Sequence, residues 1–309
     1  MTDNAIEVTG LVKQFGTKTV VNGVSLTIPT GQVWGFLGPN GSGKTTTIRM
    51  MCGLLTPSAG SGQCLGFDIL HQAKLIKQQT GYMTQKFSFW EDLTIAENLR
   101  FVARMYHLGN VKDVVSDTLH RAGLTRRQHQ LAGALSGGWK QRLALAAVTM
   151  HQPKLLLLDE PTAGVDPQAR REFWHHIQQL AQTGVTVLVS THYMDEAQRC
   201  DNIVYLANGK LISQGPVTEV IKKANLICYR LTGVHIRQYS ELLERSAGVL
   251  SVAFYGDALF VTGHSKDQLE ALLANEAYRQ LKIEPVSPAL EDVFIALTHR
   301  AGEDPRSEQ

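Results

Sequence analysis

The chain is arranged around one stretch, Gly38-Pro39-Asn40-Gly41-Ser42-Gly43-Lys44-Thr45, which fits the pattern G-x-x-x-x-G-K-[ST]. This stretch lies between residues 32–37, which are apolar and strand-like, and residues 46–51, which can continue as a helix. A strand, a glycine-rich loop and a helix in this order predict a phosphate-binding site rather than a turn that binds nothing. Backbone N–H groups of the loop and the helix start, Thr46 included, would face a polyphosphate. Lys44 is expected to reach the β- and γ-phosphates, and the Thr45 hydroxyl to bind Mg²⁺.

The composition is typical of a folded protein. The chain has 309 residues, 43% of them hydrophobic and 19% charged, and this length suits one large domain plus a smaller one. A formal net charge of +2 is too small to argue for nucleic acid as a partner. We expect no signal peptide, and no apolar run approaches the roughly 18–20 residues that cross a bilayer. The four cysteines are scattered, which favours free thiols over disulfides or a metal site.

Alternating strand and helix signals predict an α/β fold. Two stretches rich in Val and Ile, 5–14 and 19–28, predict an antiparallel hairpin at the N-terminus. Buried strands at 155–158 and 185–190, joined by a helix at 167–182, indicate a parallel sheet with helices on its faces. The block at about 87–150 has amphipathic helical periodicity and is interpreted as a helical insertion.

After residue 224 the pattern changes. Residues 226–286 read as strand, helix, two strands, helix and strand, and this β-α-β-β-α-β order is that of the ferredoxin-like arrangement. We therefore expect a phosphate-loop domain at 1–224, a small α+β accessory domain at 225–300, and a disordered polar tail at 301–309.

A second motif narrows the class of phosphate-loop protein. The stretch Leu135-Ser136-Gly137-Gly138-Trp139-Lys140-Gln141-Arg142 has the form L-S-G-G-x-x-Q-R, and it precedes a buried strand that ends in Asp159-Glu160. On these residues the chain resembles the ATP-binding cassette (ABC) ATPases over about residues 5–220. The segment after Gln85 and the ending Ser287-Pro288-Ala289-Leu290-Glu291-Asp292-Val293-Phe294 are similar to the ATPase subunits of ABC-2-type exporters. The resemblance implies that 1–224 is a P-loop NTPase domain of the ABC type, with ATP and Mg²⁺ as its ligands.

Four further side chains are candidates for the catalytic step that Lys44 serves. Asp159 ends a buried strand close to the phosphate loop, where an acid organises Mg²⁺. In the family the next acid, here Glu160, polarises the attacking water, and a Gln after a strand, here Gln85, touches both Mg²⁺ and that water. His192 follows the strand at 185–190, so we expect it at the same sheet edge, hydrogen-bonded to the γ-phosphate.

A second phosphate-ready helix N-terminus, without a lysine, is formed by Ser136, Gly137 and Gly138. In the family two such sites are explained by a head-to-tail dimer, in which the signature of one subunit closes over the ATP held by the other. Asp166 matches the family's loop at this interface, and Phe15 occupies the position of a ring that stacks on adenine. Both a homodimer and a heterodimer with another ABC ATPase are compatible with the sequence.

Three aromatic residues after Gln85 allow two interpretations. Phe87, Phe89 and Trp90 form a groove for the cytoplasmic helix of a permease, or they pack the helical insertion onto the sheet. The resemblance implies that a separate membrane permease subunit is the partner. It also implies a peripheral position on the cytoplasmic side of the cell (inner) membrane, where ATP-driven dimerisation powers the export of a drug-, lipid- or polysaccharide-like cargo.

Two other functions are compatible with parts of the sequence. One is a soluble ABC ATPase acting in translation or repair, but the chain holds one cassette and no long heptad stretch. The other is a regulatory nucleotide-binding module without turnover, against which the complete set of catalytic residues argues.

Overall fold

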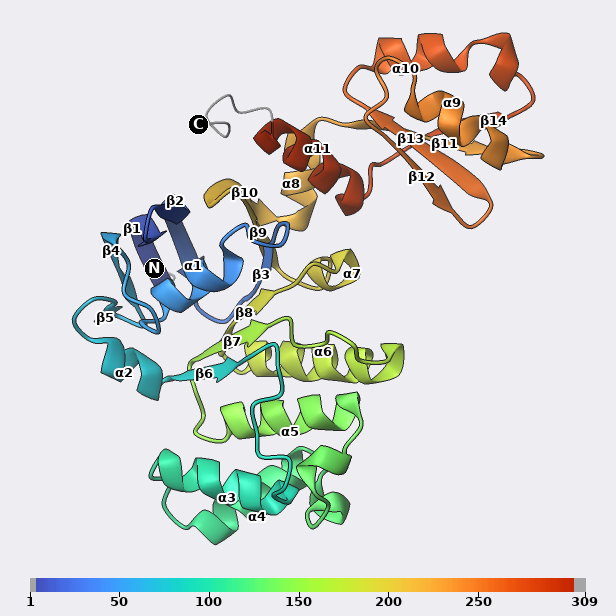
Figure 1. Ribbon diagram of the computed structural model, residues 1–309. Coiled ribbons are helices and arrows are strands. Elements are labelled where there is room, and N and C mark those ends of the chain that lie inside the picture. The colour runs from blue at the N-terminus through green and yellow to red at the C-terminus, as the bar shows by residue number, and fades with distance from the viewer. Residues whose placement is uncertain (1–3, 303–309) are drawn as a thin grey trace. The chain divides into compact units, whose positions relative to one another are not determined.

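The computed structural model describes residues 4–302, and the side chains of residues 4–298. The chain divides into two compact units, Met1–Leu211 and Ile212–Gln309, and each is described by itself (Figure 1). Of the tail expected to be disordered, residues 303–309 lie outside the described part of the chain.

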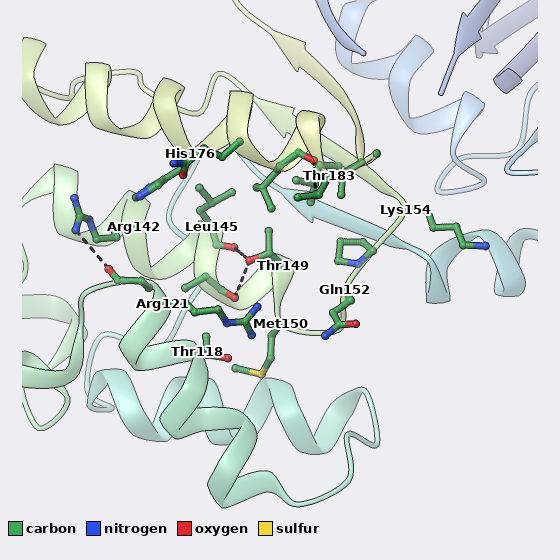
Figure 2. Close-up of a pocket in the computed structure, with 18 residues that line it drawn as sticks. Thr118, Arg121, Arg142, Leu145, Thr149, Met150, Gln152, Lys154, His176 and Thr183 are labelled. Carbon is green, nitrogen blue, oxygen red and sulfur yellow. Dashed lines mark hydrogen bonds between the residues drawn. The ribbon is translucent and has the colours of Figure 1, made fainter. Parts of the chain in front are cut away.

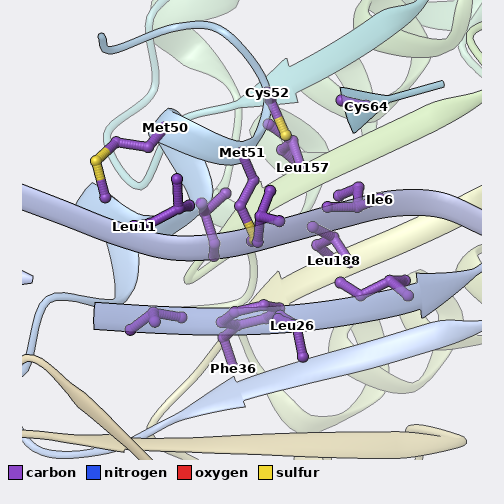
Figure 3. Close-up of a cluster of buried hydrophobic side chains, with 14 of the residues drawn as sticks. Ile6, Leu11, Leu26, Phe36, Met50, Met51, Cys52, Cys64, Leu157 and Leu188 are labelled. Atoms are coloured by element: carbon purple, nitrogen blue, oxygen red, sulfur yellow. The ribbon is translucent and has the colours of Figure 1, made fainter. Parts of the chain in front are cut away.

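An antiparallel sheet of strand order β2-β1-β4-β5 contains the predicted hairpin. Its strands are β1 Asn4–Phe15, β2 Lys18–Pro29, β4 Ala59–Cys64 and β5 Phe67–Asp68. Apolar residues of both hairpin strands are buried, among them Ile6, Leu11 and Leu26 (Figure 3). These side chains share one buried cluster with Phe36 and Met51, which flank the phosphate loop. The hydrophobic cluster therefore holds the hairpin sheet against the base of the loop.

Five strands of order β9-β3-β8-β7-β6 form the centre of the first unit. They are β3 Val33–Leu37, β6 Thr80–Met83, β7 Leu155–Asp159, β8 Thr186–Ser190 and β9 Asn202–Ala207, and the next strand in the chain, β10 Lys210–Pro216, contains the boundary between the two units. The strands from β9 to β6 pair in parallel, as the sequence predicts. They are connected through helices that include α1 Lys44–Met51, α2 Ala73–Gln78, α6 Pro167–Gln182 and α7 Met194–Ala197. Because the strands are parallel, their carboxyl ends meet at one edge of the sheet.

The predicted helical insertion forms a small hydrophobic core of its own. Its helices are α3 Ile95–Met105, α4 Val111–Arg121 and α5 Gly137–Thr149, which lie together in Figure 1. Thr94 and Glu97 form a capping box at the start of α3, with the Thr94 side chain accepting from the Glu97 N–H and the Glu97 side chain accepting from the Thr94 N–H. Buried side chains of all three helices, such as Leu99, Leu119 and Leu143, make up this core.

The second unit contains the predicted ferredoxin-like arrangement. Its antiparallel sheet has the order β12-β13-β11-β14, from strands β11 Ile227–Thr232, β12 Ser251–Tyr255, β13 Ala258–Gly263 and β14 Lys282–Val286. Its helices are α8 Val217–Ala224, α9 Ser240–Glu244, α10 Lys266–Leu273 and α11 Leu290–Gly302. The helix expected at 237–246 is shorter, because 3₁₀ turn Ile236–Tyr239 precedes α9. Helix α8 was not expected from the sequence.

Candidate functional site

The phosphate loop connects β3 to α1, as its sequence context predicts. Lys44, the first residue of α1, folds back so that its Nζ donates to the carbonyl oxygens of Gly38 at 2.8 Å and Pro39 at 3.0 Å. Burial lowers the pKa of Lys44, and the nearby carboxylates of Glu160 and Asp159 act in the opposite direction. The ammonium group is thus held by the loop, near Asp159, the last residue of β7, and Glu160, which follows it.

Two glycines of the loop differ in what surrounds them. Gly38 has φ 142°, and a Cβ added there would lie 2.0 Å from the carbonyl oxygen of Leu206. Gly41 has φ 81°, and a Cβ there would meet no heavy atom within 4 Å. Backbone conformation alone therefore disfavours a side chain at Gly41, whereas at Gly38 close packing against β9 leaves no room for one either.

This difference gives a matched pair of variants. Gly41→Ala is expected to lower the free energy of unfolding by about 1–2 kcal/mol, the cost of a left-handed backbone at an L-residue. Gly38→Ala adds a steric clash to backbone strain, and a loss of more than about 3 kcal/mol is expected. Urea denaturation of both variants measures the two free energies. Equal losses would contradict the close approach of Gly38 to Leu206.

The first acid after the loop, Asp159, is bound to the loop across the sheet edge. Thr45 Oγ1 donates to Asp159 Oδ1 at 3.0 Å, and Ser190 Oγ donates to the same oxygen. Asp159 is 9% exposed, so its carboxylate is buried with these hydroxyl partners. Hydroxyl and carboxylate oxygens are ligands that Mg²⁺ prefers, so this donor set fits that ion. Sequence reasoning missed Ser190, whose only signal was its position as the last residue of a buried strand.

The second acid, Glu160, contacts two other predicted site residues, Gln85 and His192. Gln85 Nε2 donates to Glu160 Oε2 at 2.8 Å, and His192 Nδ1 lies 3.5 Å from the same oxygen. The backbone of Glu160 has φ 46°, a conformation uncommon for a non-glycine residue, and its N–H is held by the carbonyl and hydroxyl oxygens of Ser190 at 3.0 and 3.2 Å. Such local strain concentrates at functional sites. The backbone of Glu160 is therefore held by the end of β8, while its carboxylate contacts Gln85 and His192.

Phe15 lies at the end of β1 with a half-exposed ring, and Lys13 Nζ lies 5.2 Å from its centroid. The same hairpin approaches the phosphate loop, because the carbonyl oxygen of Val20 would lie 2.7 Å from a Cβ on Gly43. The ring is thus exposed on the hairpin that borders the loop, as stacking on a base requires.

The signature residues form a separate part of the site. Ser136 is the N-cap residue of α5, but its side chain makes no capping hydrogen bond, and both Ser136 and Gly137 are exposed. Asp166 caps α6 by accepting from the N–H groups of Gln168 and Ala169, both at 3.0 Å. A cavity of about 260 Å³ beside them is lined by residues that include Ser136, Gly138 and Asp166, and, among the described residues, by none of the phosphate loop.

A larger cavity, of about 620 Å³, lies between α4, α5 and α6 (Figure 2). It is lined by Lys154 and Val185, which stand at the amino-terminal ends of β7 and β8, and by Arg142 and His176. Burial lowers the pKa of His176, and Arg142 acts in the same direction. The phosphate loop follows the carboxyl end of β3, so this cavity lies at the other end of the sheet. It is therefore distinct from the candidate site.

The three aromatic residues after Gln85 separate into two groups. Phe87 and Phe89, whose ring centroids are 5.5 Å apart, pack against the core of the helical insertion. Trp90 is 44% exposed and stacks edge-on against Phe101 of α3, with 4.3 Å between ring centroids. Buried Asn98 holds the Trp90 backbone by accepting from its N–H at 3.1 Å and donating to its carbonyl at 3.0 Å. Packing thus explains Phe87 and Phe89, and Trp90 remains on a rigidly held surface.

Comparison with known proteins agrees with this geometry. A family model described as "ABC transporter" matches residues 21–163. The Nod factor export ATP-binding protein I of Rhizobium sp. (strain N33) is 34% identical over 305 residues, covering 97% of this chain and 99% of that protein. The chain belongs to the ABC transporter ATP-binding family. The linearmycin resistance ATP-binding protein LnrL of Bacillus subtilis (strain 168) is 33% identical, with 97% and 100% of the two chains covered.

Two further comparisons show how much of the chain the similarity covers. The probable multidrug ABC transporter ATP-binding protein YbhF of Escherichia coli (strain K12) is 45% identical over 69% of this chain, which spans only 37% of the length of YbhF. The structure of cbiO1 from Clostridium perfringens, part of the ABC transporter complex cbiONQ, has a TM-score of 0.64 and 27% identity, over 78% of this chain and 99% of that one. The fold of this ABC family member is therefore that of a nucleotide-binding ATPase cassette. No helix in the described part of the chain is long and apolar enough to cross a bilayer.

Proposed function

We propose that this chain binds ATP with Mg²⁺ and hydrolyses it as the ATP-binding subunit of a membrane exporter. The observation that carries the proposal is the convergence of Lys44, Thr45, Asp159 and Glu160 at the carboxyl edge of the parallel sheet. Relatives over nearly the whole chain are named for Nod factor export and linearmycin resistance. These names favour transport over the alternative role in translation or repair.

The phosphate loop has groups suited to a polyphosphate. Ser42 is 3% exposed, and its hydroxyl has no hydrogen-bond partner within the described structure, which a phosphate oxygen would supply. Lys44 would exchange the carbonyl oxygens of the loop for phosphate oxygens, which is favourable because the latter are charged. Phe15 would stack on the adenine. The bound nucleotide supplies the γ-phosphoryl group on which the acids act.

The metal and the attacking water would be held at the edge of the sheet. Thr45, Asp159 and Gln85 would supply oxygen ligands to Mg²⁺. Glu160 would accept a proton from the water, with Gln85 fixing its carboxylate, and His192 would hydrogen-bond the γ-phosphate.

Dimerisation would complete the site. The exposed Ser136, the glycines Gly137 and Gly138, and Asp166 would face the ATP of a partner cassette, which is a second copy or a different ABC ATPase. The Ser136 hydroxyl is free to do so because it does not cap its own helix.

The membrane partner would be a separate permease subunit, reached from the cytoplasmic side of the inner membrane. Within this proposal residues 1–224 are the ATP-binding domain, with the helical insertion at about 87–150 as the part that contacts the permease. Residues 225–300 are an accessory domain.

Two measurements test the proposal. The purified chain with MgATP should release phosphate at a steady rate. No phosphate release would indicate a regulatory module without turnover. The membrane protein that co-purifies with the chain from its own cells should be a permease. Co-purification of ribosomes or DNA instead would contradict the transport role.

Trp90 offers a test of the permease contact. Replacing Trp90 by Ala removes an exposed aromatic anchor, so we expect the chain's affinity for membranes from its own cells to fall at least tenfold, which corresponds to about 1.4 kcal/mol of binding free energy. Sedimentation of the chain with these membranes measures the affinity. ATP turnover by the isolated chain should be unchanged. Tyr255→Ala, which removes another half-exposed aromatic ring, is the control and should sediment as the wild type does. Equal membrane binding by Trp90→Ala would move the contact elsewhere.

A further inference from the structure

Glu196, in the short helix α7, is a buried acid that the roles above do not use. Its side chain is 1% exposed. One carboxylate oxygen accepts a short hydrogen bond from the hydroxyl of Thr162, and the other accepts from the hydroxyl of Thr191 at 2.6 Å. Arg170 of α6 places its Nε 3.7 Å from Glu196 Oε1.

The two threonines belong to the two loops that carry the candidate catalytic side chains. Thr162 comes two residues after Glu160, in the loop that leads to α6, and it is 1% exposed. Thr191 directly precedes His192, and its hydroxyl accepts from the N–H of Tyr193 at 3.0 Å. Glu196 therefore bridges the loop after β7 and the loop after β8.

Arg170 extends this bridge to α6, the helix that Asp166 caps. Its guanidinium carbon lies 4.5 Å from the centroid of the Tyr193 ring, and its Nη1 lies 3.6 Å from the carboxylate of Asp195. The residues next to His192 are thus attached to the helix that follows the loop of Glu160.

Stability alone is a poor explanation for such a bridge. Burying a carboxylate carries a desolvation cost, and a well-packed apolar residue often serves stability equally well. The carboxylate does something an apolar residue cannot: its two oxygens accept hydrogen bonds from two hydroxyls on different loops and so join the loops. All three groups are buried, so a movement of one loop relative to the other would break a hydrogen bond that water cannot replace.

We propose that Glu196 is a positioning residue, which fixes the loop of Glu160 and the loop of His192 relative to each other through the hydroxyls of Thr162 and Thr191. This inference rests on the proposed ATP hydrolysis, in which Glu160 and His192 act on the same phosphoryl group. Glu196 itself touches no reacting atom. Its loss misaligns the water-activating acid with the γ-phosphate, and small misplacements at a reacting centre are costly.

Thr162→Val and Thr191→Val test the bridge while nearly keeping side-chain shape. Each variant is expected to lower kcat for ATP hydrolysis about tenfold, with KM for ATP within about twofold, because ATP binding by the phosphate loop does not depend on the bridge. The control is Thr186→Val, at the opposite end of β8. Thr186 is also 1% exposed, and its hydroxyl accepts from the N–H of Gly31 at 3.0 Å. It should destabilise the fold with kcat per folded molecule unchanged.

Glu196→Met gives a double-mutant test, because it nearly keeps the length of the side chain and removes both acceptor oxygens. If Glu196 acts through the threonines, adding Thr162→Val to Glu196→Met should lower kcat by much less than Thr162→Val does alone. Full multiplication of the two effects, or wild-type kcat in both threonine variants, would overturn the proposal.

Amide hydrogen exchange supplies a readout that does not depend on turnover. Thr162→Val should speed exchange in residues 190–195, which belong to the other loop, whereas Thr186→Val should not. Unchanged exchange there would also overturn the positioning role. A wild-type chain without phosphate release would instead contradict the proposed function, and the exchange result would still decide whether the two loops are coupled.

Discussion

The variant Glu160→Gln is expected to bind ATP as tightly as the wild type and to release phosphate about 10²–10⁴ times more slowly. The amide keeps the size of the side chain, and its oxygen can still accept from Gln85 Nε2, which donates to Glu160 at 2.8 Å. The backbone at this position, with φ 46° and its N–H held by Ser190, does not depend on the charge. Only the capacity to take a proton from water is lost.

Two measurements separate binding from chemistry in this variant. Equilibrium binding of a fluorescent ATP analogue should give the wild-type affinity, and single-turnover phosphate release should show the loss of rate. Glu219→Gln is a matched control, since it removes an exposed carboxylate of α8 that pairs with Lys223 at 3.6 Å. It should leave both quantities unchanged. Near-wild-type turnover by Glu160→Gln would assign the general base to another residue.

Local signals in the sequence predicted much of the fold. The hairpin of β1 and β2, the strand–loop–helix unit around Lys44, and the β-α-β-β-α-β order of the second unit each depend on residues close together in the chain. In each of these segments the spacing of apolar residues follows from which face of the helix or strand is buried, so the spacing can be recognised in the sequence. Helix α8 was missed because it starts directly after β10, at Pro216 and without a side-chain cap, so no start signal separated it from the strand.

Contacts between distant segments could not be predicted in the same way. The sequence indicated that Asp159 and Glu160 lie near the phosphate loop, but not that Ser190 holds both of them. That contact requires β7 and β8 to be neighbours with Asp159 opposite Ser190, and strand order and register are properties of the whole sheet. For the same reason nothing in the sequence singled out Glu196. The left-handed backbone of Glu160 had no signal, since such strain is imposed by tertiary structure.

The signature at the start of α5 allows a test of the composite site, and the structure selects which glycine to change. A Cβ on Gly138 would lie 2.7 Å from the Cβ of Ala169 in the same chain, so a substitution there disturbs the subunit itself. A Cβ on Gly137 would lie 3.6 Å from the carbonyl oxygen of Gly164, an ordinary contact, and the residue is exposed. Gly137→Glu should therefore leave the isolated subunit intact.

In the Glu160→Gln background, where bound ATP persists, we expect ATP to convert the chain to a dimer and Gly137→Glu to weaken that dimer by at least about a hundredfold. The new carboxylate would face the γ-phosphate of the partner's ATP, and like charges in a closed interface cost several kcal/mol. ATP affinity of the monomer and its melting temperature should not change. Gly109→Glu, at a glycine whose Cβ would meet nothing within 4 Å, is the control and should dimerise fully.

The mass of each variant with and without ATP, from light scattering, distinguishes the outcomes. A Gly137→Glu chain that still dimerises would mean that the signature does not face the partner's nucleotide. A Glu160→Gln chain that stays monomeric with ATP bound would indicate that the partner is a different cassette. Adding that cassette should then form a heterodimer, which Gly137→Glu weakens by the same mechanism, because each nucleotide in a head-to-tail pair is enclosed by groups from both chains.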